Sequence, residues 1–106
     1  MSQQLSPEHK ELYQRVDEAL HYLWDPIGVS DVPEARDEYH SYLPHVFSLL
    51  VRRASAQEIA DFLDHTATQT MGLANTERGR ERFKEVVTIM ENWRDVIHER
   101  YSRDAK

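Results

Sequence analysis

The chain has 106 residues, a length typical of one domain built around one core. Apolar residues make up 40% and charged residues 30% of the sequence, which excludes a disordered chain and a chain dominated by membrane spans. The absence of cysteine excludes disulfides and thiolate chemistry, and the formal net charge of -6 argues against binding to nucleic acid. We expect one helical domain over residues 1–106, with frayed ends near 1–5 and 102–106.

The negative charge is uneven along the chain. Residues 1–76 contain 12 acidic and 5 basic residues, a balance of -7, whereas residues 77–106 contain 7 acidic and 8 basic residues, a balance of +1. The acidic residues are densest between Asp25 and Glu38. A local negative field of this kind attracts a cationic partner and speeds its encounter.

The first predicted helix begins at Ser6 and Pro7. Ser6 can accept a hydrogen bond from a first-turn amide, and Pro7 stands where its missing N–H costs nothing. Apolar residues then recur at steps of three and four, with two aromatic residues at the edges of the stripe: Leu12, Val16, Ala19, Leu20 and Leu23, flanked by Tyr13 and Trp24. Proline disfavours the helical conformation of the residue before it, so Asp25 and Pro26 end the helix.

Residues 26–33 form the one substantial loop of the predicted fold. Two prolines and a glycine interrupt this segment, and it has no helical periodicity. Ile27, Val29 and Val32 make it unusually apolar, and burial of such side chains contributes about 1.5 to 3 kcal/mol each. We therefore expect an ordered loop that packs on the core.

The start of the second helix depends on Pro44, which stands inside an apolar run from Tyr39 to Leu50. Proline is tolerated in the first turn of a helix and kinks its interior. In one interpretation Ser41 caps a helix from about Tyr42 to Arg53. In the interpretation we favour, a short turn at 33–37 leads into a helix that reaches Arg53 and is distorted at Pro44.

The third helix has a clear start and end. Ser55 and Glu58 match a capping box, in which each side chain bonds the backbone amide of the other residue. An apolar run follows, and Gly72 can close the helix near Met71 in the left-handed conformation.

The fourth helix has the strongest pattern in the sequence. Asn75 or Thr76 can cap it. Apolar residues then keep the helical rhythm for five turns: Phe83, Val86, Val87, Met90, Trp93, Ile97 and Tyr101. No segment alternates with period two, so the predicted fold is all-α, a small bundle of four helices with one ordered loop between helices 1 and 2.

Signatures of catalysis and metal binding are missing from the sequence. It contains no glycine-rich phosphate loop, no His-Glu-x-x-His motif, no calcium loop and no nucleophile elbow. Asp17 with His21 and Asp61 with His65 stand four residues apart, but a metal needs three or four converging ligands, so we interpret them as solvated pairs. We predict no catalytic residue, no metal and no cofactor. The least favoured hypothesis is an enzyme that uses Glu58 to His65 with a divalent ion.

The segment after the first helix contains the most unusual residues. For Trp24, Asp25, Pro26, Gly28 and Arg36 we favour structural roles. Trp24 would anchor the helix end in the core, and Asp25 would cap a following turn. Gly28 would supply a backbone angle that other residues resist, and Arg36 would neutralise a nearby carboxylate.

The residues that follow are acidic and aromatic. They combine steering charge with the aromatic anchors that interface centres favour, and they are our predicted partner-binding residues: Asp31, Glu34, Asp37, Glu38, Tyr39 and Tyr42. The alternative is that this acidic face is merely solvated.

This pattern resembles a group of short bacterial proteins that share a Trp-Asp-Pro-aliphatic-Gly loop after their first helix. The matching positions here are Trp24 to Gly28, Ala35 to Tyr39 with Tyr42, and Met71 to Leu73. The resemblance spans about residues 12–97. Members of that group resemble small helical immunity proteins paired with colicin-like or contact-dependent growth-inhibition toxins, which implies a stoichiometric toxin inhibitor with no catalytic residue.

Charge and resemblance together lead to a first hypothesis of function. It is an immunity-type protein that binds and neutralises a cognate bacterial toxin, expected to be cationic and nuclease-like. The second is a regulatory or scaffold subunit that associates with itself or with another protein through apolar surface left on the fourth helix. Residues 1–6 lack the basic and apolar regions of a signal peptide, so we expect a cytoplasmic protein that acts neither on nucleic acid nor at a membrane.

Overall fold

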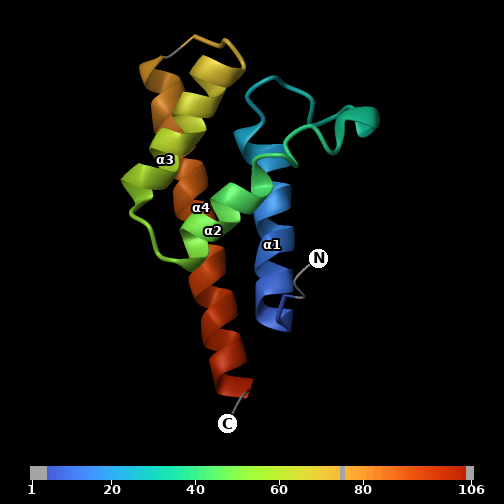
Figure 1. The fold of residues 1–106 in the computed structure, drawn as a ribbon, viewed down its shortest axis with the longest axis vertical. Coiled ribbons are helices and arrows are strands. Elements are labelled where there is room, and N and C mark those ends of the chain that lie inside the picture. The colour runs from blue at the N-terminus through green and yellow to red at the C-terminus, as the bar shows by residue number, and fades with distance from the viewer. Residues whose placement is uncertain (1–4, 75, 105–106) are drawn as a thin grey trace.

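The computed structural model describes residues 5–74 and 76–104 and confirms the all-α bundle (Figure 1). No strand occurs in these two ranges. The four helices are α1 (Pro7–Ala19), α2 (Leu43–Val51), α3 (Ala56–His65) and α4 (Glu77–Asp104). α4 reaches Asp104, past Ser102, where the sequence suggests fraying.

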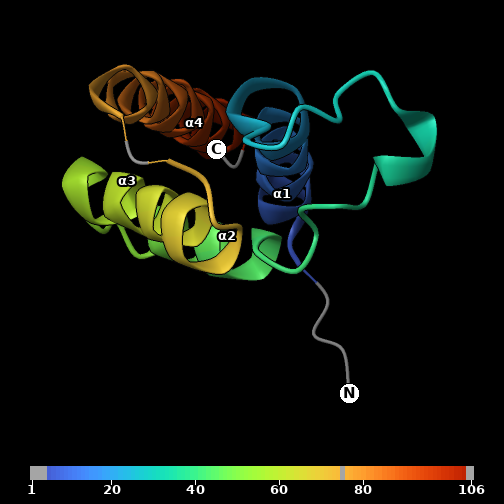
Figure 2. The same cartoon turned by 90° about the horizontal axis from the view of Figure 1, so that it is seen from above.

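The longest helix, α4, organises the bundle. α1 lies beside it and runs in the opposite direction, while α3 packs against its first half (Figures 1 and 2). α2 is short and joins the two sides of the bundle. The molecule measures 48 × 29 × 26 Å, elongated along α4.

One core joins all four helices. The largest fully buried side chains come from every helix and from the segment that follows α1: Val16, Leu20, Trp24, Val46, Leu49, Leu50, Ile59, Leu63, Val87, Met90 and Ile97. Trp93, predicted in the core rhythm of the fourth helix, is instead exposed. It lies on the edge of the buried stripe, where neither α1 nor α3 covers it fully.

The first helix begins as predicted but ends differently. Ser6 accepts a hydrogen bond from the His9 amide at 3.2 Å. The last turn is a π-helix, η1 (Leu20–Trp24). A turn with i→i+5 hydrogen bonds holds more residues than an α turn, so it rotates Trp24 into the core and Leu23 outward. The assignment of Leu23 to the core stripe is wrong for this reason.

The segment between α1 and α2 corrects two expectations. Val29 packs on the core, but Ile27 and Val32 are exposed, so the apolar side chains do not all fold inward. Pro33–Ala35 forms a 3-10 helix, η2, and turns continue to residue 42. α2 begins only at Leu43, which places Pro44 in the first turn. The favoured longer helix is therefore wrong, and Ser41 does not cap α2.

The third and fourth helices follow the predicted boundaries. Ser55 accepts from the Glu58 amide at 3.1 Å, and α3 continues as a second π-helix, η3 (Thr66–Thr70). Gly72 then takes a φ of 72°. Thr76 caps α4 by accepting from the Gly79 amide at 3.0 Å. Asn75, the other predicted cap, lies outside the described residues.

Neighbouring residues of α2 provide a test of this core. Leu50 is buried and Val51 is exposed. We expect Leu50→Ala to lower the free energy of unfolding by about 2 to 5 kcal/mol, because it leaves a cavity between packed helices. Val51→Ala is the control and should change it by about 0.5 kcal/mol or less. Urea denaturation of the three proteins measures both values, and equal losses would contradict this packing.

Candidate functional site

Trp24 is the centre of an aromatic cluster at the end of η1. Its indole ring, 1% exposed, contacts three rings: Tyr39 at a centroid distance of 5.2 Å, Tyr42 at 6.1 Å and Phe83 at 6.1 Å. Tyr39 and Tyr42 come from the segment after η2, and Phe83 comes from α4. The cluster therefore joins the segment between α1 and α2 to the helical core.

Asp25 reverses the chain directly after this cluster. Its backbone is left-handed, with φ of 32° and ψ of 59°, a conformation that Asp tolerates better than most residues. Its carboxylate accepts hydrogen bonds from the amide of Val29 at 2.8 Å and from that of Ser30 at 3.1 Å. Gly28, which lies between Asp25 and Val29 in the chain, has a φ of 71°. Asp25 thus closes a turn that needs glycine at its centre.

Tyr39 locks this turn from the other end of the segment. Its hydroxyl donates to the Asp25 carboxylate at 2.7 Å and accepts from the Ile27 amide at 3.2 Å. Burial and the hydrogen bond to Asp25 raise the pKa of Tyr39. Burial raises the pKa of Asp25 as well, but the hydrogen bonds from Tyr39 and the two amides outweigh it, so the pKa of Asp25 lies below its ordinary value.

Arg36 ties the same segment to the side of α1. Its guanidinium donates two hydrogen bonds to the Asp17 carboxylate, at 3.0 and 3.1 Å, and lies over the Tyr22 ring at 5.5 Å. His40 Nε2 lies 3.1 Å from the same carboxylate. The hydrogen bonds to Asp17 raise the pKa of Arg36, so its charge is fixed and directed back toward α1.

Four predicted site residues, which we call the acidic loop, remain free on the surface: Asp31, Glu34, Asp37 and Glu38. All four are exposed, and none has an ion pair or hydrogen bond to its side chain among the described residues. Figures 1 and 2 show that the segment carrying them projects from the bundle beside α1, on the side away from α3. Because Arg36 is directed to Asp17, the four exposed carboxylates have no compensating cation among the described residues.

The two predicted tyrosines differ from the prediction in their exposure. Tyr39 is 2% exposed, so its ring and hydroxyl are not available to a partner, and its place in the partner-binding set is wrong. Tyr42 is half-buried against Trp24. Sequence reasoning missed Asp17 and Tyr22 as partners of Arg36. These contacts join residues far apart in the chain, and no local pattern marks them.

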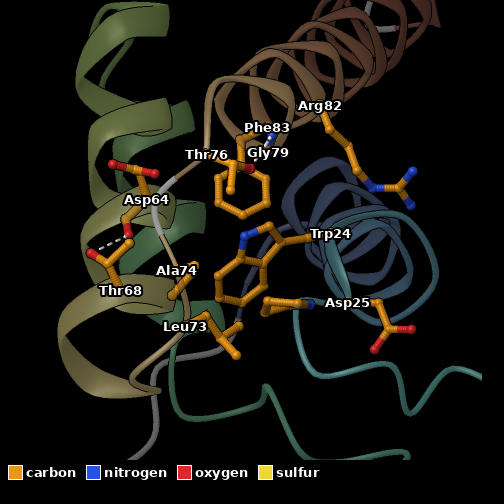
Figure 3. A pocket seen from close by; sticks show the side chains of 12 residues that line it. Trp24, Asp25, Asp64, Thr68, Leu73, Ala74, Thr76, Gly79, Arg82 and Phe83 are labelled. Carbon is orange, nitrogen blue, oxygen red and sulfur yellow. Dashed lines mark hydrogen bonds between the residues drawn. The ribbon is translucent and has the colours of Figure 1, made fainter.

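A surface pocket of about 290 Å³ lies beside Trp24 and Asp25 (Figure 3). Trp24 and Phe83 form its apolar floor, while Asp64 and Arg82 lie on opposite sides of it. The indole N–H of Trp24 is buried and has no hydrogen-bond acceptor within the described part of the chain. Arg82 donates to the Leu23 carbonyl at 2.8 Å, so this arginine stabilises the end of η1 from α4.

The histidine pairs also differ from the prediction. His21 is buried, and its Nδ1 has no hydrogen-bond partner among residues 5–74 and 76–104, while Asp17 pairs with Arg36 instead. Asp61 accepts from Gln57 at 2.7 Å. Across residues 5–74 and 76–104, no three His, Asp or Glu side chains come together as a metal site would require. No helix in these ranges has the length and apolar character needed to cross a bilayer.

Comparison of the chain with protein-family models, with curated proteins and with solved structures finds no match.

The Tyr39 hydroxyl provides a test of the locked turn. Tyr39→Phe removes one donor and one acceptor and leaves the Ile27 amide without its partner. We expect the free energy of unfolding to fall by about 1 to 3 kcal/mol. Tyr42→Phe is the matched control, because the Tyr42 hydroxyl has no hydrogen bond among the described residues. Equal stability of the two variants in urea denaturation would refute the role of Tyr39.

The lowered pKa of Asp25 predicts a dependence of stability on pH. A carboxyl group whose pKa is lowered by folding, from an ordinary value of 3.8, stabilises the folded state above that value. This contribution disappears as the pH falls through the lower folded-state pKa. We expect Asp25→Asn to be less stable at about pH 6 and to lose less stability between about pH 6 and about pH 2.5 than the unmodified chain.

Asp31→Asn is the control for this pH experiment, because the Asp31 side chain is exposed and has no partner among the described residues. Denaturant unfolding at both pH values measures the difference. A pH dependence in Asp25→Asn as large as in the unmodified chain would contradict the proposed linkage.

Proposed function

We propose that this chain is an immunity-type protein that binds a cognate basic toxin, nuclease-like in its charge, and neutralises it by covering its active surface. The observation that carries the proposal is the acidic loop. Its four carboxylates project together from an ordered scaffold, and none has an ion-pair partner within residues 5–74 and 76–104. The function is stoichiometric binding and involves no catalytic step.

The charge of the loop fits a basic partner. A nuclease must carry a cationic surface to bind its phosphate substrate, and a matching acidic surface can occupy the same cations. Elsewhere many carboxylates are paired within the chain, as Asp17 is with Arg36 and Glu11 is with Arg100. The acidic loop differs from these paired carboxylates, because its four side chains are exposed and have no ion pair among the described residues.

Apolar contacts lie beside these charges. Ile27 and Val32 are exposed in the same segment, where the sequence led us to expect burial. A surface that combines apolar side chains with surrounding charge is typical of protein interfaces, in which burial contributes affinity and charge contributes rate and specificity.

The order of the loop also favours binding. The Asp25–Tyr39 hydrogen bond and the Arg36–Asp17 pair fix both ends of the segment before a partner arrives. A preformed binding surface loses less conformational entropy on association than a flexible one. A toxin inhibitor that must act as soon as its toxin is made benefits from this preorganisation.

The experiment is co-expression with the protein encoded by the adjacent gene. We expect that protein to be basic, to arrest growth when expressed alone and to co-purify with this chain. Replacing Asp31, Glu34, Asp37 and Glu38 by Lys should abolish both protection and co-purification. A neighbour that neither arrests growth nor binds would exclude the immunity function.

A control variant with the same change in net charge distinguishes the effect of the acidic loop from the effect of total charge. It replaces four carboxylates of α3 and α4 by Lys: Asp61, Glu77, Glu81 and Glu91. This variant should keep binding. Equal loss of binding in both variants would mean that only total charge matters, and an unaffected loop variant would exclude the acidic loop as the binding surface.

The rate of association gives an independent measurement. If the acidic loop steers the encounter, the association rate should fall steeply with added salt while the dissociation rate changes little. Stopped-flow fluorescence at several salt concentrations measures both rates. An association rate that does not depend on salt would contradict electrostatic steering.

A further inference from the structure

A second surface, separate from the acidic loop, lies on the outer face of α4. Five large apolar side chains, which we call the apolar stripe, are between 36% and 53% exposed there and on the adjoining η1: Tyr22, Leu23, Ile89, Trp93 and Val96. Tyr22, Leu23, Ile89 and Trp93 line one shallow groove between α1 and α4, and Val96 continues the surface along α4.

The spacing along α4 is that of a helix–helix seam. Ile89, Asn92 and Val96 follow one another at steps of three and four residues, and Trp93 widens the same face. Continuing these steps in both directions gives Glu85 and Arg82 on one side and Glu99 and Arg103 on the other. The apolar centre thus has charged ends on a helix of 28 residues.

We propose that the apolar stripe is the interface of a homodimer, in which α4 packs antiparallel on α4 of a second copy. The midpoint of the seam falls between Asn92 and Trp93. A two-fold axis at that point places Ile89 opposite Val96 of the second copy. The same operation places Glu85 opposite Arg100 of the second copy, because both stand one turn outside the apolar centre. A two-fold interface requires such self-complementarity.

The charges around the stripe permit this pairing. Residues 77–106 carry a balance of +1, so two α4 helices can approach although the whole chain is acidic. Glu85 has no ion pair or hydrogen bond to its side chain among the described residues and is free to bind a cation. Arg100 bonds Glu11 at 3.0 Å and can bridge both carboxylates. The pairing brings one pair of like charges together, Arg82 and Arg103 of the second copy. Within its own chain, Arg82 bonds the Leu23 carbonyl and Arg103 bonds Glu99.

The area of the stripe is that of a modest dimer. A large aromatic side chain buries about 150 to 250 Å², so the exposed fractions correspond to roughly 400 Å² of apolar surface per copy. The largest apolar patch on an ordinary monomer is about 300 to 600 Å², and a patch of this size often has a function. With its polar rim, the paired surface reaches the lower range of specific interfaces, about 1,200 Å². We therefore expect a dimer that dissociates on dilution.

Sedimentation over a range of concentrations is the first experiment. The purified full chain should show a reversible monomer–dimer equilibrium. Val96→Glu should shift the dissociation constant by at least about tenfold, because it buries a carboxylate against Ile89 of the second copy. Val51→Glu is the control, because Val51 is an exposed valine on α2, outside the apolar stripe. This variant should dimerise as the unmodified chain does. A chain that stays monomeric at all concentrations would overturn the proposal.

The absence of cysteine permits a sharper test of the antiparallel register. Asn92 lies beside the two-fold axis, so the Asn92→Cys variant should form a disulfide between the two copies at this position. Glu85→Cys should not cross-link to itself, because two such residues lie roughly 22 Å apart along the antiparallel helices, beyond the reach of a disulfide. A mixture of Glu85→Cys with Arg100→Cys should give a mixed disulfide dimer. Self-linking of Glu85→Cys would indicate a parallel pair and contradict the register.

This proposal does not depend on the toxin. Dimerisation is measured on the chain alone, and the loop variants described above test the immunity function. A dimer without a toxin partner, or a toxin inhibitor that stays monomeric, would therefore separate the two proposals.

Discussion

The hydrogen bond between Tyr39 and Asp25 holds the whole segment between α1 and α2 on the helical core. It forms because the π-helical turn at the end of α1 rotates Trp24 inward and leaves Asp25 at the point where the chain reverses. The Asp25 carboxylate then accepts from two amides of the turn and from the Tyr39 hydroxyl, which in turn accepts from the Ile27 amide. Without this lock the segment would have few apolar contacts of its own, since Ile27 and Val32 are exposed. Its order therefore comes from these polar bonds together with the burial of Tyr39 and the packing of Val29 and Tyr42 on the core.

The distribution of charge follows from the same lock. By fixing Tyr39, the turn brings Arg36 to the side of α1, where it pairs with Asp17. Arg36, the one Lys or Arg residue between residues 26 and 42, is thereby directed away from the outer surface, and the carboxylates of the acidic loop remain there without it. Carboxylates elsewhere in α1, such as Glu8 and Glu11, pair with His98 and Arg100 of α4 and so join the two long helices. Acidic residues therefore have two roles in this molecule. Some form ion pairs between helices, and those of the acidic loop form an exposed negative surface.

The parts of the fold that were predictable from sequence are those decided within one turn of chain. Ser6, Ser55 and Thr76 bond amides three residues ahead, and Gly72 closes a helix through its own backbone freedom. The errors come from tertiary contacts. Helical periodicity assumes α geometry, so it placed Leu23 in the core stripe, whereas the π turn at the end of α1 leaves Leu23 exposed. The aromatic cluster buries Tyr39, whose residue type and acidic neighbours suggested an interface. Arg36 does neutralise a carboxylate, but its partner Asp17 lies 19 residues away, beyond the reach of a local pattern. No residue near these positions in the sequence carries a signal of such contacts.

The exposure of Trp93 also depends on tertiary packing, and it gives α4 the apolar stripe. A single stripe of apolar residues can be covered by one layer of neighbours, but α4 carries apolar residues over a wider arc than α1 and α3 enclose. Ile89, Trp93 and Val96 fall in the uncovered part of that arc, with Arg15 of α1 over one side of the Trp93 ring at 5.2 Å. The arc meets the acidic segment at Tyr22, whose ring supports Arg36 while its edge borders the groove between α1 and α4. The two surfaces are therefore adjacent at Tyr22, although one is charged and the other apolar.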